Sequence, residues 1–309
     1  MQARQARFRL HWDVRPQTDW SGSLIGIAGA GRVAQALGRL LYDSGQPVRY
    51  VASRDREHAC AAARFIGPEV RAVEYAELAV GAPRLLIAVS DSALAPVAAS
   101  LGAVRGILLH TCGAQGADVL RSPQAPEVAC GTLHPLQTIA DGAAGSAALE
   151  GIAFAVSGDE AAVAWAEQIA AIAHGRVLRI PDQRRPLYHA AAVMAGNYQA
   201  ALLAAAQTLL AAAEVEPAEA LAALGPLART SLENVLRAGP AAALTGPIQR
   251  GDLGTLAVHL EALRGVSPVV ERLYRAAGLE TLEVSRERGL SAERAAEIEQ
   301  MLEMELSGK

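Results

Sequence analysis

The sequence predicts an α/β domain built on a parallel β-sheet, followed by an all-helical domain. Between residues 24 and 180, short apolar runs of strand length alternate with helical patterns. This alternation is typical of βαβ units, whose parallel strands are buried on both faces and therefore appear as continuous apolar runs. After Pro181 strand-like runs become sparse, and helical patterns continue toward the C-terminus. A chain of 309 residues that is 51% apolar but only 4% aromatic suits two domains rich in closely packed helices.

The elements follow in order from this pattern. Residues 21–181 are expected to form the sheet domain and residues 182–309 the helical domain, with the boundary near Pro181. The helical domain is expected to open with one long helix over 186–213, in which Gly196 is the single glycine. Residues 1–20 contain four arginines but no apolar stretch of the signal-peptide kind, so we expect an N-terminal extension without a function. The predicted strands are 24–28, 48–52, 85–89, 106–110, 152–156 and 176–180.

Composition and charge exclude several classes of protein. A net charge of -4 argues against a general nucleic-acid binder, which needs a basic surface. The three cysteines have no metal-ligand spacing and suit a reducing compartment, so neither a zinc site nor a disulfide framework is expected. No apolar run is long enough to span a membrane without polar interruption. We therefore expect a cytoplasmic protein that binds neither nucleic acid nor a membrane and holds no metal.

The first predicted strand leads into a glycine-rich turn, Gly29-x-Gly31-x-x-Ala34, which opens a helix. Gly29 permits the tight turn, Gly31 lets the backbone approach a pyrophosphate, and a small residue at Ala34 lets the helix pack on the strand. The helix N-terminus then faces the phosphates. This context predicts a Rossmann-type dinucleotide site on the backbone of Gly29, Ala30, Gly31, Arg32 and Val33.

The end of the second predicted strand bears on the choice between NADP and NAD. Ser53 and Arg54 stand where an NAD enzyme usually has an acidic residue for the ribose hydroxyls. A hydroxyl and a guanidinium suit a 2′-phosphate, because arginine binds phosphate bidentately. In the alternative interpretation Arg54 and Arg56 are solvated and Asp55 binds the ribose. We favour NADP(H).

Polar residues also follow the third and fourth long strands. Val89, Ser90 and Asp91 come after one, and His110 ends the other, followed by Thr-Cys-Gly. Ligands of open α/β sheets bind at the carboxyl ends of the strands, so we expect these residues on the nicotinamide side. The alternative for His110 is a strand end with one backbone hydrogen bond.

Hydride transfer requires an acid and groups that orient the substrate, and three polar clusters offer them. The first is His134, in a segment predicted to be a loop. The second is His189 with Asn197, which lie about 12 Å apart along an ideal helix and about 80° around it. The third comprises Thr245, Arg250 and Asp252, an anchor for an anion. The alternatives are a buried structural histidine for His189 and a capped turn for 245–252.

The sequences of these clusters resemble those of a known family, the Rossmann-like NADP-dependent oxidoreductases with a C-terminal domain of unknown function. The similarity runs from about residue 24 to the C-terminus, and ketopantoate reductases and pyrroline-carboxylate reductases are related to the family. The segments that carry it are HPLQT from His134, YHAAAV from Tyr188 with Asn197-Tyr198, Glu233-Asn234, and ALTGPIQRGD from Ala243.

The resemblance implies roles for particular residues. His189 occupies the place of the lysine that protonates the product oxygen in ketopantoate reductases if Asn197 occupies that of their asparagine. Thr245 corresponds to a substrate-binding serine. The lysine itself and the glutamate that follows the Thr255 position in those enzymes are absent here. A histidine still serves as an acid near neutral pH.

We therefore expect hydride transfer from NADPH to the carbonyl of a small anionic 2-oxo acid, with ketopantoate as the first candidate. His189 and Asn197 are the predicted catalytic residues, and His134, Thr245, Arg250 and Asp252 the predicted substrate ligands. The alternatives are an imine reductase of the pyrroline-carboxylate type and a non-catalytic NADP(H) sensor. The small residues over 186–213 also predict a homodimer through the helical domain, or else the core of a monomer.

Overall fold

The computed structural model describes residues 22–102, 104–140 and 145–304, so the predicted extension over 1–20 lies outside the described residues. It divides into two compact units, Met1–Val193 and Met194–Lys309. The division falls after Val193 rather than at the expected Pro181, because the segment that follows the last strand packs back onto the sheet through Arg185 and Tyr188.

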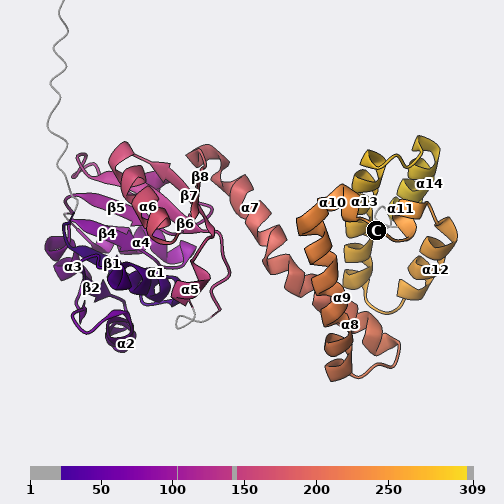
Figure 1. Cartoon of the computed structure of the whole chain (residues 1–309), viewed down its shortest axis with the longest axis horizontal. Coiled ribbons are helices and arrows are strands. Elements are labelled where there is room, and N and C mark those ends of the chain that lie inside the picture. The colour runs from indigo at the N-terminus through magenta and orange to yellow at the C-terminus, as the bar shows by residue number, and fades with distance from the viewer. Residues whose placement is uncertain (1–21, 103, 141–144, 305–309) are drawn as a thin grey trace, which may run out of the picture. The chain divides into compact units, whose positions relative to one another are not determined.

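The first unit is built on one eight-stranded sheet in the order β3-β2-β1-β4-β5-β6-β7-β8. All neighbouring strands are parallel except β6 and β7, which are antiparallel. The predicted fold class, a largely parallel sheet followed by helices, is confirmed (Figure 1). The strands are β1 (Ile25–Ala28), β2 (Val48–Ala52), β3 (Arg71–Ala72), β4 (Arg84–Ile87), β5 (Ile107–His110), β6 (Ala129–Pro135), β7 (Ala153–Gly158) and β8 (Arg176–Arg179).

The sheet separates two apolar cores, because successive side chains of a strand point to opposite faces. In β4, Leu86 belongs to one core, and Leu85 and Ile87 belong to the other. The first core is covered by α1 (Arg32–Asp43), α2 (Arg56–Ile66) and α6 (Glu160–Ile172), the second by α3 (Tyr75–Gly81), α4 (Asp91–Ser100) and η1 (Ala117–Leu120). α5 (Gly145–Ala148), η2 (Asp182–Arg184) and α7 (Arg185–Ala195) are the other helical elements of this part of the chain.

Strand β6 corrects the sequence analysis, which placed His134 in a loop. The strand contains Cys130, Gly131 and Thr132 instead of a continuous run of large apolar residues, so the apolar pattern was missing. It is nevertheless a buried strand, paired with β5 on one side and β7 on the other. His134 is therefore held on a rigid element.

The second unit is all-helical. A small core is formed by Ile248, Leu256, Leu282, Ala295, Ile298 and Leu302. None of the helices in the described residues is long and apolar enough to cross a membrane. The helices are α8 (Asn197–Ala212), α9 (Pro217–Ala238), α10 (Pro240–Ala243), α11 (Pro247–Arg250), α12 (Leu253–Leu263), α13 (Pro268–Glu287) and α14 (Ala292–Glu303).

The prediction of one long helix over 186–213 is wrong, because the segment forms two helices. α7 ends at Ala195 and α8 begins at Asn197, with Gly196 at φ -106° and ψ -72° between them. Glycine is a poor helix former because its backbone loses the most conformational freedom on ordering. The expected spacing of His189 and Asn197 assumed one continuous helix and therefore does not apply.

Candidate functional site

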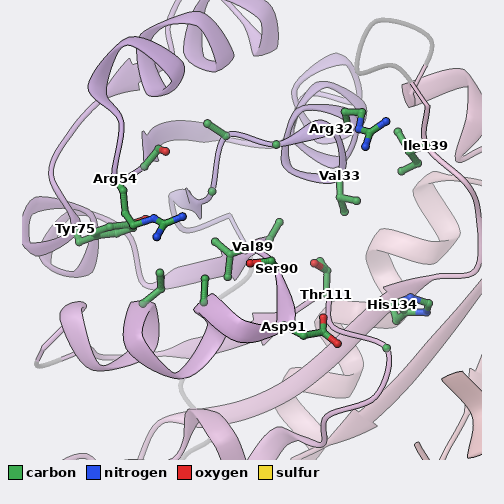
Figure 2. Close-up of a pocket in the computed structure, with 18 of the residues that line it drawn as sticks. Arg32, Val33, Arg54, Tyr75, Val89, Ser90, Asp91, Thr111, His134 and Ile139 are labelled. Carbon is green, nitrogen blue, oxygen red and sulfur yellow. The ribbon is translucent and has the colours of Figure 1, made fainter. Parts of the chain in front are cut away.

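A cavity of about 520 Å³ opens at the carboxyl ends of β1, β2, β4 and β5 in the first unit. Arg54 and Tyr75 lie at one end of this cavity, and Thr111, Asp91 and His134 lie at the other (Figure 2). Every predicted cofactor residue except His110 lines it: Gly29, Ala30, Gly31, Arg32, Val33, Ser53, Arg54, Val89, Ser90 and Asp91. The predicted residues His134 and His189 line it as well.

The turn after β1 has the form that a pyrophosphate requires. Gly29 has φ +126°, and a Cβ atom there would collide with the carbonyl oxygen of Ala88. Gly31 begins α1 as its N-cap without a side-chain hydrogen bond, and no atom lies within 4 Å of a Cβ placed there. Ala34 is fully buried beneath the turn. The open helix N-terminus therefore faces the cavity with unpaired backbone N–H groups that suit phosphate oxygens.

The end of β2 accounts for the choice of cofactor. Ser53 and Arg54 line the cavity. The Asp55 carboxylate instead accepts a 3.1 Å hydrogen bond from the His58 amide as the N-cap of α2, and Arg56 pairs with Glu74 at 3.1 Å. Arg54 is thus the guanidinium available to a 2′-phosphate.

Tyr75, the first residue of α3, also lines this end of the cavity beside Arg54 (Figure 2). The sequence analysis missed it, because a tyrosine at the start of a short helix carries no motif.

His110 corrects another prediction. The residue is fully buried and does not line the cavity. Its Nδ1 accepts from the Cys112 amide at 3.2 Å, so Nε2 carries the proton and donates to the Gly116 carbonyl oxygen at 3.0 Å. Burial lowers the pKa of His110 to about 4. It is a neutral structural residue that shapes the loop after β5, as the alternative interpretation expected.

Two histidine rings meet at the other end of the cavity. His134 of β6 and His189 of α7 are edge to face, with ring centroids 5.7 Å apart. Gly113 lines the cavity beside them. Each imidazole has ring nitrogens that can donate or accept a proton, so this end of the cavity is suited to acid–base chemistry.

α7 docks on β6 through two pairs of residues. Arg185 donates to the Thr132 hydroxyl at 2.8 Å, and the Tyr188 hydroxyl lies 2.7 Å from Nδ1 of His134. Residues three apart share a helix face and residues two apart share a strand face, so one face of α7 meets one face of β6. This register sets His189, the next residue along α7, at the cavity.

Arg185 is the most deeply buried charge at this end of the site. Its side chain is fully buried, donates to the Cys112 carbonyl at 3.1 Å and lies 5.8 Å from the Tyr188 ring centroid. Desolvation lowers the pKa of its guanidinium. The nearby Asp182 carboxylate accepts from the Ala117 amide at 3.0 Å.

The surroundings of His134 on β6 and Tyr188 on α7 determine the protonation states of these two side chains. Burial, followed by the positive field of Arg185 and by His189, lowers the pKa of His134 to about 4. Burial raises the pKa of Tyr188 to about 12. Both are therefore neutral near pH 7.

The other predicted residues belong to the second unit. Asn197 is exposed at the start of α8, and Thr245 and Arg250 are exposed around α11. Both carboxylate oxygens of Asp252 are engaged by Thr255, through its amide at 3.0 Å and its hydroxyl at 2.7 Å. Asp252 is thus the N-cap of α12, which agrees with the alternative of a capped turn.

Sequence comparison finds one family match in each part of the chain. Residues 24–111 match a family described as NADP oxidoreductase, coenzyme F420-dependent. Residues 152–281 match a domain of unknown function, DUF2520. No curated protein sequence matches the chain.

Solved structures share the fold over most of the chain. A Bacteroides fragilis protein described as a candidate NADP oxidoreductase is 25% identical, with a TM-score of 0.68 over 85% of this chain and 98% of its own. Protein TM1727 from Thermotoga maritima is 20% identical, with a TM-score of 0.68 over 85% and 99%. Plasmodium falciparum pyrroline carboxylate reductase with NADP bound is 12% identical, with a TM-score of 0.56 over 90% and 98%.

The fold and the cavity define a dinucleotide-dependent oxidoreductase with a Rossmann-type domain. The chain combines an NADP oxidoreductase domain over residues 24–111 with a DUF2520 domain over residues 152–281, and NADP(H) is the cofactor that this combination indicates. The open N-terminus of α1 and Arg54, for whose side chain no partner is found among the described residues, fit that cofactor, since they offer donors for its pyrophosphate and 2′-phosphate.

Proposed function

We propose that this protein reduces the carbonyl group of a small anionic 2-oxo acid with NADPH, and that ketopantoate is the first substrate to test. The observation that carries the proposal is the meeting of His134 and His189 at the end of the cavity away from Arg54. When bound, NADPH supplies a hydride. The protein must then supply a proton to the oxygen that becomes a hydroxyl.

His189 is the acid in this proposal. Its ring lines the cavity and is only partly buried, so it can be reprotonated from solvent after each turnover. His134 is also partly buried, but its lowered pKa keeps it neutral near pH 7, and it is held on a strand and hydrogen-bonded to Tyr188, so it is better suited to orient the substrate than to gain and lose a charge. The two histidines thus have different tasks that follow from their different surroundings.

The buried Arg185 supports an anionic substrate. Its hydrogen bonds to Thr132, Ser157 and Cys112 all go to uncharged oxygens. Its positive field is therefore only partly compensated, by the Asp182 carboxylate near it. A low-dielectric setting strengthens the attraction for an anion bound at this end of the cavity.

One observation favours imine reduction as a second candidate. The Asp91 carboxylate lines the same end of the cavity, close to Thr111 (Figure 2). A carboxylate stabilises a protonated imine, whereas it repels a carboxylate substrate. Pyrroline carboxylate reductase, with which the chain shares its fold, has a name that points to such a substrate.

The decisive assay follows NADPH oxidation by the purified protein with ketopantoate, with a cyclic imine acid and with neither. Oxidation with ketopantoate that is lost in His189→Ala, while NADPH still binds, is the expected result. Oxidation with the imine alone would replace the carbonyl proposal. Tight NADPH binding without turnover on either class would favour the sensor interpretation.

We also propose that the chain forms a homodimer through the helical unit. α8 has no buried residue, and α9 has one, Ala220. The exposed large apolar side chains of these helices are Tyr198, Leu202, Leu221, Leu227, Leu232 and Leu236. Exposed apolar surface of this extent marks an interaction site in soluble proteins.

Sedimentation velocity tests this proposal. The wild type should sediment as a dimer, and Leu232→Asp together with Leu236→Asp should shift it to a monomer. A wild-type monomer at all accessible concentrations would contradict it.

A further inference from the structure

The hydroxyl of Tyr188 and Nδ1 of His134 lie 2.7 Å apart. Their rings are edge to face, with centroids 5.5 Å apart. Within the described residues this is the one hydrogen bond found for either side chain. The sequence analysis noted Tyr188 beside His189 but gave it no role.

The direction of this hydrogen bond follows from the two groups. A neutral imidazole has one donor nitrogen and one acceptor nitrogen, and a phenol can donate its single hydrogen or accept at its oxygen. The described residues offer the Tyr188 hydrogen no acceptor other than Nδ1. The short separation also matches an O–H donor better than an N–H donor. These considerations favour Tyr188 as the donor to Nδ1, which places the proton of His134 on Nε2.

The Nε2 atom faces the site. A Cβ atom placed at Gly113, which lines the cavity, would lie 2.9 Å from Nε2 of His134. No hydrogen bond to this nitrogen is formed within the part of the chain that the structure describes. A proton on Nε2 is thus available to a ligand at the end of the cavity.

We propose that Tyr188 is a positioning residue that holds His134 in its Nε2–H tautomer, so that His134 donates a hydrogen bond to the substrate atom that receives the proton. The assignment of a substrate atom rests on the proposed reductase function. A fixed N–H donor polarises a carbonyl before the hydride arrives and stabilises the developing negative charge. His189 then delivers the proton.

Arg185 holds Tyr188 in turn. Its guanidinium lies 5.8 Å from the Tyr188 ring centroid, within the range of a cation–π contact. The same guanidinium is anchored on Thr132, two residues before His134 on β6. Strand β6 therefore carries His134 and also anchors Arg185, which contacts the ring of Tyr188.

The direct test is the tautomer itself, read by ¹⁵N–¹H correlation spectra of the histidine rings in the full-length protein. His134→Gln assigns the His134 signals. We expect a protonated Nε2 and an unprotonated Nδ1 in the wild type, and a mixture of both tautomers in Tyr188→Phe. A wild-type signal with the proton on Nδ1, or a Tyr188→Phe spectrum identical to that of the wild type, would overturn the proposal. This readout needs no substrate, so it is independent of whether the proposed function holds.

The chain offers a matched control. Tyr274 of α13 and Nδ1 of His259 form the same kind of pair in the second unit, at 2.8 Å, and neither lines the cofactor cavity. Tyr274→Phe therefore removes an equivalent hydroxyl and should leave the His134 signals and turnover unchanged. A loss of turnover in Tyr274→Phe equal to that in Tyr188→Phe would show a general structural effect and contradict the proposal.

A double-mutant cycle connects the tautomer to turnover on whichever substrate is active. Tyr188→Phe should lower kcat/KM about tenfold, the effect of one lost hydrogen bond that orients a polar group. In the His134→Gln background the same substitution should change kcat/KM by less than about twofold, because the pair is already broken. Additive effects would mean that Tyr188 does not act through His134.

Discussion

Gly113 leaves no room for a side chain beside His189: a Cβ atom there would lie 2.5 Å from Cδ2 of that imidazole. The same Cβ atom would lie 2.9 Å from Nε2 of His134. Contacts below about 3 Å force atoms to move, so any substitution at Gly113 displaces both rings that line this end of the cavity.

Gly113→Ala should therefore lower kcat/KM about tenfold or more, because small misplacements of reacting groups are costly. NADPH affinity should change little, since the phosphate-binding turn lies at Gly29 and Gly31. Steady-state kinetics and fluorescence titration measure the two effects. Gly225→Ala, a position with no atom within 4 Å of the new Cβ, is the control. Unchanged turnover in Gly113→Ala would show that His134 and His189 do not take part in the reaction.

Arg54 should set the preference for NADPH over NADH. Removing a guanidinium that binds phosphate costs about 1.5–3 kcal/mol, so Arg54→Ala should raise the KM for NADPH about tenfold to a hundredfold. The KM for NADH should stay nearly constant. Arg56→Ala is the matched control, because Arg56 pairs with Glu74 and does not line the cavity. An equal loss for both cofactors would refute the assignment.

Two histidines with lowered pKa values, the buried His110 and the partly buried His134, predict a loss of stability in acid. The pKa values of His110 and His134 are lowered to about 4, below the usual 6.5 of an unfolded histidine. The unfolded chain therefore binds more protons than the folded one, so the free energy of unfolding falls as pH decreases from about 6.5 to about 4. Each residue contributes at most roughly 3 kcal/mol to this loss.

Urea unfolding between pH 7 and pH 4 measures this dependence. His110→Gln cannot titrate, and its stability should fall less steeply than that of the wild type over the same range. A wild-type stability that is flat or rises toward pH 4 would show that the two rings are charged in the folded protein.

Arg185 should be essential to the docking of α7 on β6. Its planar fork reaches Thr132, Ser157 and Cys112 at once, whereas a lysine cannot reproduce that geometry. Arg185→Lys should therefore lower the free energy of unfolding by about 2–3 kcal/mol, as expected when buried acceptors lose their donors. The exposed neighbour Arg184 gives the control, since Arg184→Lys should change stability by less than about 0.5 kcal/mol. Equal effects at both positions would contradict this role.

The parts of the structure that sequence predicted well depend on local chemistry. The turn at Gly29 and Gly31 and its flanking strand and helix follow from residues close together in the chain, whereas Asp252, predicted as a substrate ligand, is the N-cap of α12. The choice of NADP likewise followed from Ser53 and Arg54, because the residue after the second strand of such a sheet contacts the ribose.

The parts that sequence did not predict depend on tertiary contacts. Strand β6 has small and polar residues, and its burial comes from its neighbours β5 and β7. The pairs of Arg185 with Thr132 and of Tyr188 with His134 join residues more than fifty positions apart. His110 ends a strand, where the sequence analysis expected a residue that contacts the cofactor. In the structure its Nε2 donates instead to the Gly116 carbonyl oxygen.

The central claim, hydride transfer at the histidine end of the NADP cavity, is tested most directly with deuterium-labelled NADPH. The cofactor is labelled in turn on each face of the nicotinamide C4 and incubated with ketopantoate or the cyclic imine acid, and the product is analysed by mass spectrometry. We expect deuterium on the reduced carbon of the ketopantoate product from one face only, and no transfer in His189→Ala. Binding of NADPH without deuterium in any product, from either face, would contradict the account.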